Sequence, residues 1–119
     1  MNLRSMLARL TDIYEAINAI ENHLLVTPLD MFETNSLVYR AVERELEIIS
    51  EASRHIADEE KNRFQDIEWR KMADLGNQLR HAYQRVDPNL LKQVIRFHLP
   101  ALERAVGIML EEARSLTPP

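Results

Sequence analysis

Apolar residues recur every three or four positions along almost the whole chain, and this spacing restricts the fold more than any other feature. It places the apolar side chains on one stripe of a helix, whereas a half-buried strand would alternate apolar and polar residues. The 119 residues include only two glycines, and they contain no strand-like alternation, internal repeat or low-complexity block. The sequence therefore predicts an all-α fold in which four or five helices pack as an antiparallel bundle.

Breaks in the stripes predict where the first helices end. The first stripe begins at Leu3 and predicts a long helix that ends near His23, ahead of the breaker Pro28. The second stripe predicts a helix over residues 37–56. The polar run 57–64 has few apolar anchors, so we expect a connection that carries one short helical turn.

The second half of the chain predicts two more helical segments. A third main helix is expected from Ile67 to Ala82, with Asp66 as its N-cap. Asp87-Pro88 marks a fresh start, because proline is tolerated in a first helical turn. The last stripe then contains Pro100, whose ring removes one hydrogen bond and clashes with the preceding turn, so we expect this helix to be kinked near it.

Length and composition favour one globular domain spanning residues 1–119. A chain of this length buries about two-thirds of its unfolded surface on folding. The apolar share of 45% and charged share of 29% are typical of a globular rather than a disordered protein. The net charge of −4 argues against nonspecific coating of nucleic acid, although a small basic site in an acidic protein can still bind a phosphodiester.

The sequence also predicts where the protein resides. It has no cysteine, so nothing implies disulfides or an oxidising compartment. No segment approaches the roughly 20 consecutive apolar residues of a membrane span, and the segment from Met1 to Arg4 leads into an amphipathic pattern. We expect a cytoplasmic protein with no membrane partner.

The segment from Gly76 to Tyr83 carries the densest group of chemically useful side chains. A helix turns by about 100° per residue. If Leu79 marks the core direction, then Asn77, His81 and Arg70 project roughly opposite to it. His81 is therefore predicted to lie off the apolar stripe.

Three neighbouring side chains on this helix suit phosphate chemistry. Asn77 lies one turn before His81, so its amide is placed to orient the imidazole or a phosphate, and Arg80 adds a guanidinium fork. Arg70, two turns earlier on the outward face, would extend a phosphate track. Spacing alone is equally compatible with a solvated polar face.

A metal site or cofactor is not predicted. The four histidines are scattered, with no H-x-x-x-H pair. The chain likewise has no glycine-rich phosphate loop and no nucleophile elbow.

Four segments in this order resemble the HepT family, which belongs to the all-helical HEPN superfamily. They are Ala41–Ala52, Glu68-Trp69-Arg70, Asn77-x-x-x-His81-x-Tyr83 and Leu99-Pro100-x-Leu102. The resemblance covers most of the chain. It implies the toxin of a type VII-like toxin–antitoxin pair, whose partner is a minimal nucleotidyltransferase called MntA.

The resemblance further implies a metal-independent endoribonuclease whose site forms at a homodimer interface, where two R-x4-6-H-x-Y signatures face each other. RNA carries its own nucleophile, the 2′-hydroxyl, so two copies of His81 would suffice as base and acid. The expected products are a 2′,3′-cyclic phosphate and a 5′-hydroxyl. The motif tyrosine, here Tyr83, would accept AMP groups that silence the toxin.

This sequence departs from the family pattern where an arginine usually precedes the motif asparagine, because Gly76 stands there. Glycine inside a helix costs about 1 kcal/mol relative to alanine, which suggests a close contact or an altered site. Helical side chains lean toward the N-terminus, so Arg80 would lie over the vacant position. We hypothesise that Arg80 supplies the missing charge. The alternative is a catalytically impaired helical dimer that acts as binding partner or substrate of a nucleotidyltransferase.

A second departure lies in the segment that usually reads Gly-Glu-Ala in the family and here reads Ser50-Glu51-Ala52. Glu51 is expected either to orient a site residue or to form an interhelix hydrogen bond.

Overall fold

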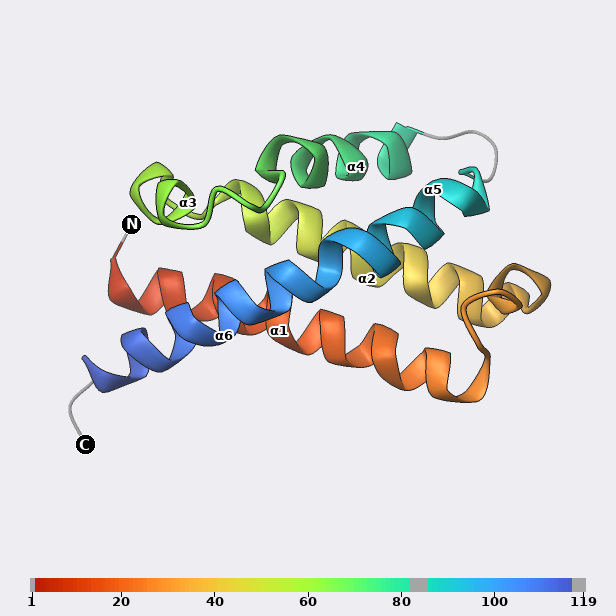
Figure 1. The fold of residues 1–119 in the computed structure, drawn as a ribbon, viewed down its shortest axis with the longest axis horizontal. Coiled ribbons are helices and arrows are strands. Elements are labelled where there is room, and N and C mark those ends of the chain that lie inside the picture. The colour runs from red at the N-terminus through yellow and green to blue at the C-terminus, as the bar shows by residue number, and fades with distance from the viewer. Residues whose placement is uncertain (1, 82–85, 117–119) are drawn as a thin grey trace.

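The computed structural model describes residues 2–81 and 86–116, and the regular structure in these two ranges is helical throughout (Figure 1). The predicted all-α bundle is therefore confirmed. The four longest helices are α1 (Leu3–Val26), α2 (Ser36–Arg54), α4 (Trp69–His81) and α6 (Leu99–Ser115). The shorter elements are η1 (Phe32–Thr34), α3 (Asp58–Arg63), α5 (Pro88–Gln93) and η2 (Val94–His98).

Polar side chains fix the starts of three helices. Asn2 precedes α1 and accepts a hydrogen bond of 2.8 Å from a first-turn amide. Asn35 accepts two such bonds, of 3.1 and 3.2 Å, at the start of α2. Asp87 caps α5 at 2.9 Å, with Pro88 in the first turn as predicted. Each cap satisfies amides that have no partner within their own helix.

Three predicted boundaries are wrong by two or three residues. Helix α2 ends at Arg54, two residues before position 56. Helix α1 continues to Val26, three residues past His23, because no breaker precedes Pro28. Helix α4 starts at Trp69 instead of Ile67, so Asp66 is not its N-cap. The chain first makes a turn that buries Ile67 in the core and bonds its amide to the preceding turn. The predicted last residue of α4, Ala82, lies outside the described residues.

The irregularity expected at Pro100 takes the form of a wide turn just before it. Helical turns continue from α5 through η2 into α6, and η2 is π-helical, with the amide of Leu99 bonded to the carbonyl of Val94. Pro100 then lies in the first turn of α6, where its missing N–H costs little. Such π turns are a known cause of helix kinks.

The long helices alternate in direction, which makes the bundle antiparallel (Figure 1). Helix α1 packs against both α2 and α6, and α2 packs against both α1 and α4. Helix α4 therefore lies on the outer side of α2, and the contact between these two helices positions the polar residues of interest.

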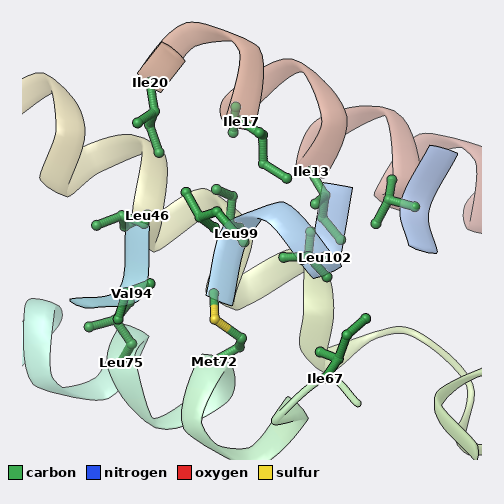
Figure 2. Close-up of a cluster of buried hydrophobic side chains, with 14 of the residues drawn as sticks. Ile13, Ile17, Ile20, Leu46, Ile67, Met72, Leu75, Val94, Leu99 and Leu102 are labelled. Carbon is green, nitrogen blue, oxygen red and sulfur yellow. The ribbon is translucent and has the colours of Figure 1, made fainter. Parts of the chain in front are cut away.

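Side chains from every long helix meet in one core (Figure 2). On α4 the buried face is formed by Met72 and Leu75, while Leu79 is partly buried. The labelled residues of the core are Ile13, Ile17, Ile20, Leu46, Ile67, Met72, Leu75, Val94, Leu99 and Leu102.

Candidate functional site

Helices α2 and α4 touch at Ser50 and Gly76. The Ser50 hydroxyl is fully buried, accepts a hydrogen bond of 3.0 Å from the Gly76 amide and donates one of 3.1 Å to the carbonyl of Ala73. A Cβ at position 76 would lie 2.9 Å from the Cβ of Ser50 and closer still to its hydroxyl oxygen. The close contact expected at Gly76 is thus confirmed, and only glycine fits beside Ser50.

The Arg80 side chain lies over Gly76, as its helical lean predicts. Its Nη1 is 3.2 Å from the position that a Cβ of Gly76 would take. Its Nη2 donates a hydrogen bond of 2.5 Å to Oδ1 of Asn77. Its Nη1 lies 3.7 Å from a carboxylate oxygen of Glu51 on α2. Arg80 is therefore held by its own helix and by its neighbour.

Three residues at the end of α2 join Asn77 and Arg80 in a polar cluster, which consists of Glu51, Arg54, His55, Asn77 and Arg80. Arg54 Nη1 donates a 3.2 Å hydrogen bond to Asn77 Oδ1, and His55 Nε2 lies 3.2 Å from Glu51 Oε1. The hydrogen bond with His55, and then the charges of Arg80 and Arg54, hold the pKa of Glu51 below its ordinary value. Glu51 is therefore an anion at neutral pH, and it links His55 to Arg80 across the two helices.

The predicted site residues do not all gather in this cluster. Asn77 is half-buried between α2 and α4, so the prediction that it projects away from the bundle is wrong. His81 is exposed one turn further along α4, as predicted, and contacts no polar group of residues 2–81 or 86–116. Arg70 is exposed and forms no hydrogen bond or ion pair with the cluster in those ranges, and Tyr83 lies outside the described residues.

A shallow depression of about 300 Å³ opens beside the cluster. Arg80 and Glu51 are among the residues that line it. The remaining lining residues are Arg9, Asp12, Arg44, Glu47, Ile48 and Ala52, so that the charges around it are mixed.

In the part of the chain that the structure describes, no three histidine, aspartate or glutamate side chains are placed to hold a metal ion together. No described helix is long and apolar enough to cross a membrane.

Sequence reasoning missed the contribution of Arg54. Arg54 and Asn77 lie 23 positions apart on different helices, so the spacing of residues along one helix does not predict their contact. Glu51 was expected to orient a site residue or to form an interhelix hydrogen bond. Its contact with Arg80 of α4 is an ion pair of 3.7 Å, which is longer than a hydrogen bond, and its contact with His55 lies at the end of its own helix. The contact between Glu51 and His55 could have been predicted from their i, i+4 spacing.

Comparison with known proteins gives one family. Its model, described as "Ribonuclease HepT-like", matches residues 13–109. "Putative RNase MJ1380" of Methanocaldococcus jannaschii is 33% identical over 109 residues, which are 92% of this chain and 100% of that protein. "Probable ribonuclease HepT" of Thermococcus cleftensis is 37% identical over 94 residues, or 79% of this chain and 86% of that one. No solved structure gives a significant match. The chain therefore belongs to the HepT-like ribonuclease family.

Proposed function

We propose that this protein is a metal-independent endoribonuclease and the toxin of a toxin–antitoxin pair, with its site formed where two protomers meet. The observation that carries the proposal is the position of Arg80, which lies over Gly76 and bonds to Asn77, one turn before His81. A guanidinium thus lies beside the position at which the resemblance leads us to expect an arginine. The family membership of the chain supports RNA as the substrate.

The reaction needs only groups that this chain supplies. One His81 imidazole removes the proton of the 2′-hydroxyl, whose oxygen attacks the adjacent phosphorus. The bond from phosphorus to the 5′-oxygen breaks, and the His81 of the second protomer protonates that oxygen. Arg80 stabilises the charge on the pentavalent phosphorus. The products are a 2′,3′-cyclic phosphate and a 5′-hydroxyl.

The proposed partner is a minimal nucleotidyltransferase that acts as antitoxin. The Tyr83 phenol would attack the α-phosphorus of ATP, pyrophosphate would leave, and the resulting AMP group would place negative charge next to His81. That charge would repel the RNA backbone. Mass spectrometry after incubation with the partner and ATP tests this step, and a Tyr83→Phe variant that still gains the same AMP mass would contradict it.

Cleavage of a labelled RNA panel in the presence of EDTA tests the proposed function. We expect His81→Ala to reduce cleavage by about 100-fold or more, as for other general acid–base residues. Arg80→Ala should lose about 10- to 100-fold, and Arg80→Lys should recover part of that loss. Arg40→Ala removes another exposed arginine, near the opposite end of α2, and serves as the control.

The outcomes separate the two readings of the sequence. Unchanged activity in Arg80→Ala would refute the compensation of Gly76 by Arg80. A wild-type protein that binds the nucleotidyltransferase, is not toxic when expressed alone and shows no His81-dependent cleavage would support the catalytically impaired binding partner.

A further inference from the structure

Two guanidinium groups converge on one uncharged oxygen at the contact of α2 and α4. Oδ1 of Asn77 accepts from Arg54 Nη1 at 3.2 Å and from Arg80 Nη2 at 2.5 Å. Arg54 comes from the last turn of α2 and Arg80 from the last turn of α4. The two cations are thus brought within reach of a single acceptor by helix packing alone.

The charge of this pair is only partly balanced. Glu51 is the carboxylate nearest to Arg80, yet at 3.7 Å it lies beyond ordinary hydrogen-bond distance. Its other oxygen is engaged by His55 at 3.2 Å. One carboxylate thus faces two guanidinium groups, which leaves a net positive charge around Asn77.

An oxyanion would satisfy this arrangement better than the amide does. Hydrogen bonds from guanidinium to a charged oxygen are roughly twice as strong as those to a neutral one. The planar fork of arginine also matches two oxygens of a phosphate group. Arg54 is exposed at the surface, so a phosphate can approach it without unfolding the helix contact.

We propose that Arg54 is a second phosphate-binding residue, and that Arg54 and Arg80 together bind a phosphate of the RNA backbone beside Asn77. The inference rests on the proposed function for the identity of the ligand. The bound phosphate lies over Asn77, one helical turn from His81. Arg54 would thereby fix the backbone of the RNA relative to the imidazole that reacts with it.

Two probes test the inference without relying on cleavage. The first is inorganic phosphate, titrated into the full-length protein while NMR follows the side-chain amide of Asn77. The second is a single-stranded RNA with 2′-O-methyl groups, which lacks the nucleophile, and its Kd is measured by fluorescence anisotropy at several salt concentrations. The variants are Arg54→Ala, Arg54→Lys and the control Arg40→Ala.

We expect phosphate to shift the Asn77 amide signal in wild type and in Arg40→Ala, and to leave it unchanged in Arg54→Ala. The Kd for the 2′-O-methyl RNA should rise about 10-fold in Arg54→Ala. The slope of log Kd against log salt should fall by about 0.7, the loss of one phosphate contact on a single strand. Arg54→Lys should keep the slope and recover part of the affinity, which a purely structural role in holding Asn77 would not produce.

Failure of this inference and failure of the proposed function give different results. If Arg54→Ala retains the wild-type Kd, salt slope and phosphate shift, Arg54 does not bind phosphate even where wild type cleaves RNA. A wild type without the phosphate shift overturns the inference as well. If wild type binds phosphate and RNA through Arg54 but does not cleave, the phosphate site stands and the ribonuclease proposal falls.

Discussion

The hydroxyl of Ser50 fills the space that a side chain at Gly76 would need, and it accepts a hydrogen bond of 3.0 Å from the Gly76 amide. The resemblance to the HepT family leads us to expect glycine at the first of these positions and arginine at the second, and this chain has neither. Packing against Ser50 leaves no room for the expected arginine side chain, and Arg80 Nη1 lies 3.2 Å from the position that a Cβ at residue 76 would take.

This contact predicts that Gly76→Ala destabilises the protein. In an ordinary helix the same change stabilises by about 1 kcal/mol. Here the new Cβ would overlap Ser50, which is fully buried and cannot move aside freely. We expect the free energy of unfolding to fall by about 1–3 kcal/mol, measured by urea denaturation.

Gly107→Ala on α6 is the matched control, because the nearest atom to its new Cβ would be Tyr14 Cε1 at 4.0 Å. It should stabilise by about 0.5–1 kcal/mol. In a Ser50→Gly background the cost of Gly76→Ala should disappear, which a double-mutant cycle measures. Equal costs of Gly76→Ala with and without Ser50 would show that the two residues are not coupled.

The sequence predicted those side-chain positions that depend on the geometry of a single helix. Asn77, His81 and Arg80 share one helix, so their relative positions follow from its periodicity, and the lean of Arg80 toward Gly76 is confirmed. Arg54 contacts Asn77 only because α2 and α4 pack in one particular register, which neither helix encodes alone. The late start of α4 has a similar cause, because burial of Ile67 in the core outweighs the capping preference of Asp66.

Glu51→Gln should strengthen RNA binding and weaken catalysis. The change removes the negative charge 3.7 Å from Arg80, so less repulsion opposes the RNA backbone. We expect the Kd for 2′-O-methyl RNA to fall about two- to five-fold, as for the loss of one exposed charge interaction. We also expect kcat to fall, since Arg80 loses the group that holds it from α2.

Glu47→Gln, one turn earlier on α2 and paired with Arg44 at 3.6 Å, is the control for Glu51→Gln. It should change neither Kd nor kcat by more than about two-fold. A drop in affinity for Glu51→Gln would mean that Glu51 supports RNA binding directly and does not oppose it.

Tyr39→Phe should destabilise the protein by removing a hydrogen bond between distant segments. The Tyr39 hydroxyl donates to the carbonyl of Val86, which ties α2 to the chain that follows α4, and the Tyr39 ring stacks on Phe32 at 5.1 Å. The ring contact survives the substitution, but the partly buried carbonyl loses its donor. We expect a loss of about 1–2 kcal/mol in thermal or urea unfolding. Tyr14→Phe changes an exposed ring on α1 and should not measurably change the free energy of unfolding. An equal loss of stability in Tyr14→Phe would show that the hydrogen bond of Tyr39 is not the cause of the effect.

The stability of the protein should fall as pH rises toward neutrality, because Glu21 of α1 lies beside the carboxyl of Glu103 of α6. Hydrogen bonding to Glu103, then burial, and then the charge of Glu103 raise the pKa of Glu21 from 4.5 to about 7. The folded protein therefore binds this proton more tightly than the unfolded chain does. The resulting stability is present in full below pH 4.5 and is lost as pH rises through about 7.

Glu21→Gln keeps a group that can donate to Glu103 but removes the titration. Urea unfolding at pH 5 to 8 should show a fall in wild type, on the order of 1 kcal/mol after allowing for the water that reaches Glu21, and a flatter profile in the variant. Glu15→Gln changes an exposed glutamate on the same helix and should keep the wild-type slope. If Glu21→Gln retains that slope too, the carboxyl pair between α1 and α6 does not set the pH dependence of folding.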